Sequence, residues 1–167
     1  MKRFISSLLV LLILLSLAGC KSADGKAANF YYVRDSYVFG KEDGVMVAES
    51  RSIEGYTDTQ EILREYLKGP QDISLVSPFP ADIEIVGYRY EGETLYITLC
   101  AHIVTLPKAK QVLACACFAR TAMELTGVKA VYFQTDESDF TRMDPILIDR
   151  ESVLLYDDYN APVPSEP

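Results

Sequence analysis

One segment, residues 83–100, most restricts what this chain can fold into. Two runs rich in β-branched and aromatic residues, 83–90 and 94–100, flank the turn-prone Glu91-Gly92-Glu93, which predicts a β-hairpin. Along the second run, apolar residues alternate with Thr94, Tyr96 and Thr98. Because successive side chains of a strand point to opposite faces, only one face of the resulting sheet is suited to apolar packing.

Two helices are expected to cover that apolar face. The first starts near Thr57 and Gln60, which have the spacing of a capping box, and it ends at Gly69-Pro70. The second runs from Pro107 to about Thr126, just before Gly127. Its expected inner stripe is Val112, Ala116, Ala119 and Met123, with Leu113 and Cys117 beside it.

Further strands are predicted at residues 30–33, 45–53 and 128–134. The order is therefore β-β-α-β-β-α-β, and the predicted fold class is α+β: a two-layer sandwich of one small mixed β-sheet with two helices on one face. Such a fold leaves the other sheet face free. We expect Thr94, Tyr96 and Thr98 to point there, as a possible interaction surface centred on Tyr96.

The N-terminus has the three parts of a secretory signal. Lys2 and Arg3 precede an apolar stretch of about 12 residues, which is shorter than the roughly 20 that a membrane-spanning helix needs. The segment Leu17-Ala18-Gly19-Cys20 resembles the bacterial lipobox. This resemblance implies lipidation of Cys20 and cleavage before it, so that the protein is held on the extracytoplasmic face of the cell membrane. An ordinary signal peptide with an incidental cysteine is the alternative.

Without residues 1–19, the 167-residue chain keeps 148 residues, enough for one domain with its own core. The expected segments are a signal peptide (1–19), the lipidated cysteine with a flexible tether (20–28), a folded domain (29–136), a C-terminal extension packed on it (137–159) and a disordered tail (160–167). Loss of the two N-terminal cations takes the formal net charge from −8 to −10. This acidic balance argues against a nucleic-acid partner, because phosphate binding needs clustered Lys and Arg.

Several short motifs, taken in order, resemble the GerMN domain of spore-germination and sporulation proteins. Residues 61–70, EILREYLKGP, place Leu67, Gly69 and Pro70 on the family's Leu-x-x-Gly-Pro motif, and LVSPFP places Ser77, Pro78 and Pro80 on its Ser-Pro-x-Pro motif. The hairpin, an alanine-rich helix and GVKAVYFQTD follow as in the family. The resemblance covers residues 29–136.

The resemblance implies a fold similar to that of ring-building motifs. It also implies a lipid-anchored, extracytoplasmic protein that supports assembly of a membrane complex without known catalysis. The chain departs from the family pattern in three respects. It has room for one domain where the founding member has two, Cys100 follows the hairpin where an acidic residue and serine are usual, and Glu137 follows Asp136 where glycine is usual.

Residues capable of chemistry are few in this sequence. His102 is the only histidine and no Gly-x-Ser-x-Gly motif occurs, so a hydrogen-bonded loop histidine is expected. Cys115 and Cys117 would point about 200° apart on a helix, which makes a poor metal chelate and predicts buried thiols. A disulfide between Cys100 and either Cys115 or Cys117 is an alternative that the sequence does not decide. The acidic cluster Asp136, Glu137, Asp139, Asp144 and Asp157-Asp158 is expected to be a solvated face, because it lacks a calcium-loop spacing. No metal site and no cofactor are predicted.

The leading interpretation is a non-enzymatic interaction module of the cell envelope with a protein partner or self-assembly, and sporulation or germination is the process that the family resemblance implies. The alternative is a lipoprotein that binds cell-wall glycan or a small solute. A hydrolase lacks any nucleophile-and-base signature. Five tyrosines are either ordinary sheet packing or a contact surface for such a ligand: Tyr31, Tyr32, Tyr88, Tyr90 and Tyr96.

Overall fold

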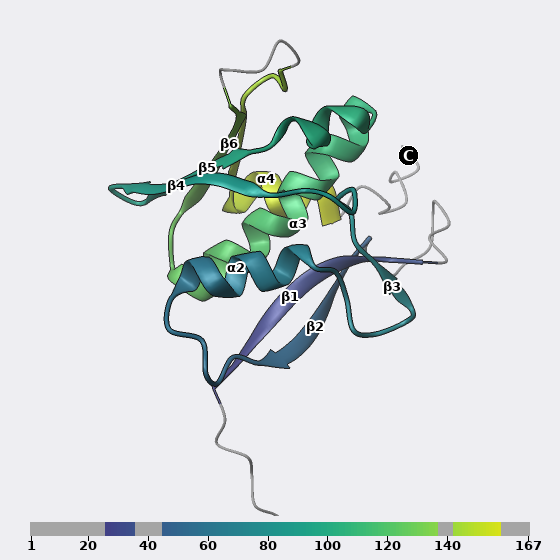
Figure 1. Cartoon of the computed structure of the whole chain (residues 1–167), viewed down its shortest axis with the longest axis vertical. Helices are drawn as coiled ribbons and strands as arrows, with labels where there is room; N and C mark the ends of the chain where they lie inside the picture. The colour runs from purple at the N-terminus through teal and green to yellow at the C-terminus, as the bar shows by residue number, and fades with distance from the viewer. Residues whose placement is uncertain (1–25, 36–44, 137–141, 158–167) are drawn as a thin grey trace, which may run out of the picture.

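The strands of this protein form two sheets that share no strand (Figure 1). The computed structural model describes residues 26–35, 45–136 and 142–157. In the first sheet, β1 lies between β2 and β3 and is antiparallel to both. The second sheet has the order β4-β5-β6-β7, in which β5 and β6 are parallel and the other pairs antiparallel. The strands are β1 (Ala27–Arg34), β2 (Met46–Ser52), β3 (Leu75–Val76), β4 (Ile85–Glu91), β5 (Thr94–Leu99), β6 (Ala130–Thr135) and β7 (Ile146–Asp149).

The helical segments are α2 (Thr59–Leu67), the 3-10 helix η1 (Ala101–Thr105), α3 (Lys108–Thr126) and α4 (Arg150–Asp157). The α+β class and the order β-β-α-β-β-α-β are confirmed, with the two-residue strand β3 added after α2. The structure differs from the expected single sheet, because β1 pairs with β2 and β3 and not with the hairpin. Strand partners far apart in the chain carry no local sequence signal, whereas the hairpin β4-β5 does.

The start of α2 is capped one residue later than the sequence predicts. Asp58, not Thr57, is the N-cap, and its carboxylate accepts the backbone N–H of Glu61 at 2.8 Å. The Glu61 carboxylate in turn accepts the backbone N–H of Thr57 at 2.9 Å. The reciprocal cap therefore uses Asp58 and Glu61, whose carboxylates also suit the positive end of the helix dipole.

The ends of both long helices follow the predicted signals. Helix α2 stops at Leu67, and Gly69 has a φ of 98°, a left-handed value that favours glycine. Pro107 is the N-cap of α3, and Gly127 ends the helix with a φ of 76°. At Gly69 and Gly127 the backbone adopts a left-handed conformation that residues with a Cβ atom rarely take.

Helix α3 lies at the centre of the molecule, not on one side of it. Every residue from Ala114 to Ala119 is fully buried, so the expected single inner stripe does not describe this helix. Ala116, Ala119, Met123 and Cys117 are buried as predicted, but Val112 and Leu113 are only half-buried. The alanine and cysteine side chains are small enough to let neighbouring elements approach α3 from several directions.

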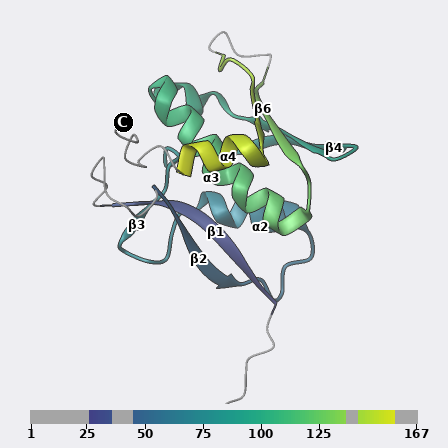
Figure 2. The same ribbon diagram turned by 180° about the vertical axis from the view of Figure 1, so that it is seen from behind.

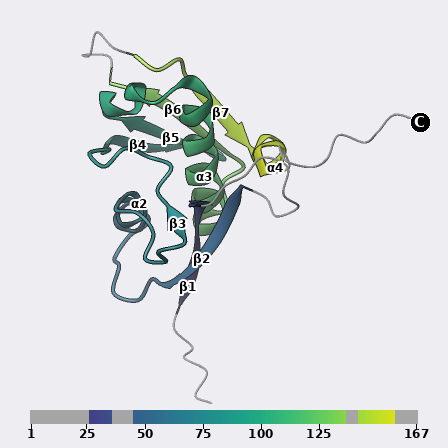
Figure 3. The ribbon, with the colours of Figure 1, turned by 90° about the vertical axis from the view of Figure 1, so that its right-hand side faces the viewer.

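Four elements surround α3. One face of the second sheet packs on α3 (Figure 3). In this contact the Phe133 ring of β6 meets the Phe118 ring of α3 edge-on, with 5.6 Å between the ring centres. Phe118 also contacts Tyr66 of α2. Helix α3 also contacts β1 and α4, which lie next to it in Figure 2. Among the described residues, no helix is long and apolar enough to span a bilayer.

Candidate interaction surface

The second sheet has one buried and one partly open face, as the alternation in β5 predicts. Leu95, Ile97 and Leu99 are fully buried against α3, together with Val131 and Phe133 of β6. The alternate positions of β5, namely Thr94, Tyr96 and Thr98, point to the other face and are half-buried. The structure thus brings the three sequence-predicted surface residues together on one strand.

A continuous row of side chains crosses this outer face. The strand register places Arg89 of β4 opposite Tyr96, Tyr96 beside Tyr132 of β6, and Tyr132 opposite Leu147 of β7. The Tyr96 and Tyr132 rings lie 5.1 Å apart at 41°, and Leu147 is 57% exposed. We call these four residues the outer row. An exposed aliphatic next to paired tyrosines is typical of a protein contact surface.

The Tyr96 ring is partly covered within the row. The Arg89 guanidinium carbon lies 4.1 Å from its ring centre, and Arg89 also forms an ion pair with Glu91. Beside it, the Gln134 amide donates to the Thr98 hydroxyl at 3.2 Å. Because the guanidinium occupies one face of the ring, that face is closed to a stacking sugar.

The other four tyrosines do not join this surface. Tyr31 and Tyr32 are buried, so of the two alternatives for them ordinary packing holds and a contact surface does not. Tyr88 and Tyr90 lie opposite Ile97 and Leu95 on the inner side of β4, where their hydroxyls hydrogen-bond at 2.7 Å. Tyr31 and Tyr32 are adjacent on β1 and so point to opposite sides of the strand. Both are buried, because α2 packs on the Tyr32 side and α3 also lies along the strand.

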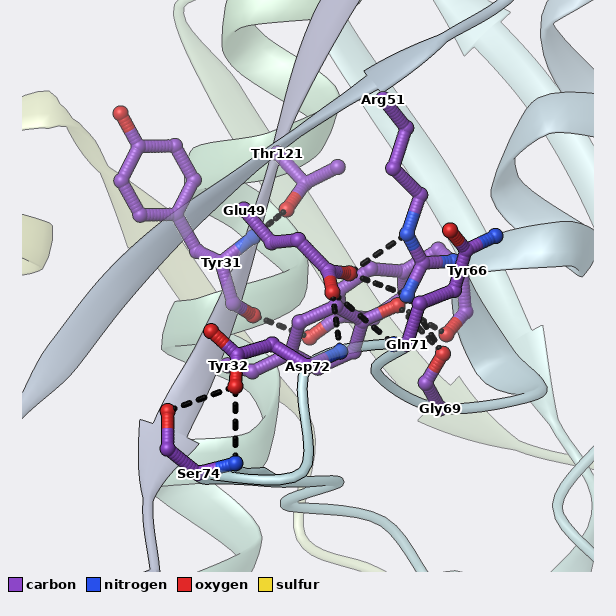
Figure 4. Close-up of polar contacts among 10 residues, drawn as sticks. All are labelled: Tyr31, Tyr32, Glu49, Arg51, Tyr66, Gly69, Gln71, Asp72, Ser74 and Thr121. Atoms are coloured by element: carbon purple, nitrogen blue, oxygen red, sulfur yellow. Dashed lines mark hydrogen bonds and ion pairs between the residues drawn. The ribbon is translucent and has the colours of Figure 1, made fainter.

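A polar network fixes the loop that follows the Gly69-Pro70 motif (Figure 4). Arg51 of β2 forms an ion pair with Glu49 and donates to the Gly69 carbonyl at 2.7 Å. The second carboxylate oxygen of Glu49 accepts the backbone N–H groups of Gln71 at 2.9 Å and Asp72 at 2.6 Å. Sequence reasoning missed Glu49 and Arg51, and only their i, i+2 spacing on one face of a predicted strand hints at them.

The network rests on a stack of aromatic rings. The Arg51 guanidinium carbon lies 5.0 Å from the Phe30 ring centre and 5.3 Å from that of Tyr32, and Tyr32 stacks on Tyr66 at 4.9 Å. Burial raises the pKa of the Tyr32 and Tyr66 hydroxyls, which therefore stay protonated and act as donors. Tyr32 donates to the carbonyls of Tyr66 and Gly69, which ties the end of α2 to β1.

The residues considered for chemistry occupy structural positions. His102 is exposed on η1, with Nδ1 2.8 Å from the Asp82 carbonyl oxygen, as a hydrogen-bonded loop histidine should be. Cys115 and Cys117 are fully buried and Cys100 is half-buried, and no disulfide joins these three described cysteines. Burial raises the pKa of the Cys115 thiol to about 12.

No metal site is seen in the part of the chain that the structure describes, where no three acidic, histidine or cysteine side chains come together. Asp144, from the predicted acidic cluster, pairs with Lys108 at 2.7 Å. Three other members of that cluster (Glu137, Asp139 and Asp158) lie outside the described residues, as does Cys20.

Comparison with known families decides the classification. The sequence model of Germane, described as "Sporulation and spore germination", matches residues 29–139. This chain belongs to the Germane family. The match includes both sheets up to β6 and ends before β7, although β7 continues the second sheet.

The solved structure of GerM supports the same fold. The chain is similar to the tandem GerMN domains of the sporulation protein GerM from Bacillus subtilis, with a TM-score of 0.50 and 18% identity over 72% of this chain. It spans 42% of the length of that tandem-domain chain. It is also similar, with a TM-score of 0.42 and 17% identity, to a protein from Clostridium perfringens described as a lipoprotein; 76% of this chain and 89% of that one are covered. No curated protein matches the sequence. The fold is that of a GerMN-type domain.

Proposed function

We propose that this Germane-family protein is a non-enzymatic interaction module that supports assembly of a sporulation or germination complex in the cell envelope. In this proposal, residues 1–19 are a signal peptide and the lipid on Cys20 anchors the protein to the extracytoplasmic face of the membrane. A tether then joins the lipid to the folded domain, and it ends by residue 26 and not at 28 as expected from the sequence, because β1 begins at Ala27. The family match over residues 29–139 is the observation that carries the proposal.

The outer row is the surface that we assign to partner binding. It presents two tyrosines, an arginine and a half-exposed leucine on four adjacent strands, and tyrosine and arginine are enriched at binding hot spots. The position of Arg89 over the Tyr96 ring favours a protein partner over a glycan, because a sugar would stack on the ring face that the guanidinium occupies.

A non-enzymatic role is supported by the contacts of the residues that could react. His102 holds its Nδ1 2.8 Å from the Asp82 carbonyl oxygen on the exposed η1, and the Cys115 thiol is buried with a pKa of about 12, so Cys115 is not poised as a nucleophile at neutral pH.

The anchor is tested with Cys20→Ala in the native host. The wild-type protein should partition into the detergent phase in a processed form that carries lipid. The variant should remain uncleaved or be released from the membrane. A variant that is still processed as a lipoprotein contradicts the anchor.

The assembly role is tested by complementing a deletion strain with Tyr96→Ala or Leu147→Asp. Both variants should lower spore yield or germination towards the level of the deletion strain, while the melting temperature moves by only a few degrees. Tyr90→Ala is the matched control, because Tyr90 is 47% exposed but lies on the other side of the sheet. A deletion strain that sporulates and germinates normally would contradict the proposal, and binding of the protein to purified cell-wall sacculi would favour the glycan alternative.

A further inference from the structure

The loop between α2 and β3 presents an isoleucine to solvent. Ile73 is 96% exposed, far more than any other large hydrophobic side chain within residues 26–35, 45–136 and 142–153; the next, Leu147 and Val86, are 57% and 55% exposed. Its neighbours Gln71, Asp72 and Ser74 are polar and typical of a turn. Nothing within the fold uses this apolar side chain, so burial of Ile73 against another molecule would gain the full transfer free energy of an aliphatic side chain.

The backbone on both sides of Ile73 is fixed. Before it, the Glu49 carboxylate accepts the N–H groups of Gln71 and Asp72. After it, the Asp72 carboxylate accepts the N–H of Ser74 at 2.8 Å and its hydroxyl at 2.7 Å, and the Ser74 carbonyl accepts the Asp35 N–H at 2.9 Å. A loop held by this many bonds is already ordered before any partner binds.

The base of the loop is connected to the core. Glu49 is paired with Arg51, and the side chains of the two are only 11% and 6% exposed. Arg51 lies on the Phe30 and Tyr32 rings. The exposed tip is therefore supported by buried, well-packed groups, as a preorganised binding residue is.

We propose that Ile73 is the anchor of a protein–protein contact, in which its side chain enters an apolar pocket of a partner protein whose rim offers positive charge or hydrogen-bond donors to Asp72. Because the loop is ordered in the free protein, binding loses little conformational entropy. The free energy gained by burying a single aliphatic side chain is therefore not offset by the cost of ordering the loop. The contact is separate from the outer row and requires neither the lipid anchor nor a role in sporulation.

Two observations favour a protein over a lipid surface. Asp72 next to Ile73 carries a carboxylate whose pKa is held below its ordinary value by the Ser74 bonds, so it is ionised at neutral pH and is repelled by anionic headgroups. The loop also lies beside Asp35, past the end of β1, whereas the chain enters β1 at Ala27. A strand of eight residues spans about 26 Å, which places Ile73 far from the proposed anchor.

The first experiment places a photo-reactive side chain on the loop in the native host. Full-length protein with Ile73→p-benzoylphenylalanine is irradiated in cells, and adducts are identified by mass spectrometry. Val86→p-benzoylphenylalanine is the matched control, because Val86 is an exposed aliphatic residue at the irregular start of β4. A defined protein adduct from position 73 and not from position 86 supports the proposal. Adducts with lipid alone, or no adduct at all, would overturn it.

The second experiment measures binding of the identified protein, purified, to the full-length chain. Ile73→Asp should raise Kd by about tenfold or more, and Val86→Asp should leave it within about twofold. The melting temperatures of both variants should stay close to that of the wild type, since both side chains are solvent-exposed. Equal affinity of the wild type and Ile73→Asp for the identified protein would overturn the proposal. If only outer-row substitutions weaken this binding, the Ile73 proposal is also overturned, but the proposed function still holds.

Discussion

The Tyr66 hydroxyl donates to the backbone carbonyl of Tyr31 at 2.8 Å, and this bond joins α2 to β1. The N–H of the same Tyr31 residue donates to the Thr121 hydroxyl of α3 at 2.9 Å. The side chains of Tyr66 in α2 and Thr121 in α3 thus hydrogen-bond the backbone C=O and N–H groups of Tyr31, which point away from β2. At Tyr31 these two bonds replace the hydrogen bonds that a neighbouring strand would make, because β3 pairs only with Val33 and Arg34.

Tyr66→Phe isolates the value of this bond. The ring keeps its stacking, but the Tyr31 carbonyl loses its donor in a buried site, so the free energy of unfolding should fall by about 1–3 kcal/mol. Urea denaturation measures this change. Tyr56→Phe is the control at an exposed tyrosine and should change stability by less than about 0.5 kcal/mol. Equal stability of wild type and Tyr66→Phe would mean that the bond contributes nothing.

Leu63→Ala and Val112→Ala should differ in their effect on stability, although each residue lies on one of the two helices that the sequence predicts to cover the sheet. Leu63 is fully buried, so its truncation should cost about 2–5 kcal/mol. Val112 is half-buried near the start of α3 and should cost about 1 kcal/mol or less. Thermal or urea unfolding distinguishes the two. A larger loss for Val112→Ala would contradict the packing of α3 described here.

Glu49→Ala should be strongly destabilising. It leaves the Arg51 guanidinium buried without its carboxylate and frees two backbone N–H groups of the loop, a change worth about 3–5 kcal/mol. Glu65→Ala removes an ion pair with Lys68 on the surface of α2 and should cost less than about 1 kcal/mol. Comparable losses in the two variants would show that the loop network adds no stability.

The reactivity of the thiols should follow their burial. At pH 8, the pKa of about 12 leaves the Cys115 thiol protonated, and burial shields both Cys115 and Cys117. Iodoacetamide should therefore label Cys100 first and the two helix cysteines only after unfolding. Peptide mass spectrometry measures the labelling order. Early labelling of Cys115 in the folded protein would contradict the central position of α3.

The stability supplied by Asp72 should depend on pH. Its pKa is lowered from the ordinary value of 3.8 by the Ser74 backbone and hydroxyl bonds. The contribution is therefore present above about pH 4 and is lost as the pH falls through the lower folded value. Wild type should be more stable than Asp72→Ala at pH 6, and the difference should shrink near pH 2.5. In Ser74→Ala this pH dependence should be weaker, because one donor is missing.

Local features of the fold could be read from the sequence, and non-local ones could not. Gly92, Pro107 and Gly127 each fix a turn or a helix end within a few residues, and the structure has those boundaries as predicted. The division into two sheets depends on which strands pair across the chain, for which no residue carries a signal. A strand as short as β3 has no readable periodicity.

In the candidate surfaces, too, local features could be predicted from the sequence and non-local contacts could not. The orientation of Tyr96 follows from strict alternation in β5, a local property. Its partners Arg89 and Tyr132 come from strands whose register only the folded chain defines. Ile73 has a weak sequence signal, an apolar residue within a polar turn, but its near-complete exposure depends on how Glu49 holds the loop.

The central position of α3 has a consequence for the order in which the chain becomes structured. Residues 27–99 contain β1 to β5, yet the apolar side of the hairpin and the free edge of β1 both await α3, residues 108–126. A polypeptide delivered from its N-terminus onward therefore exposes Leu95 and Ile97 until roughly three quarters of its length is available. The core around α3 therefore closes only when this late segment of the chain has been delivered.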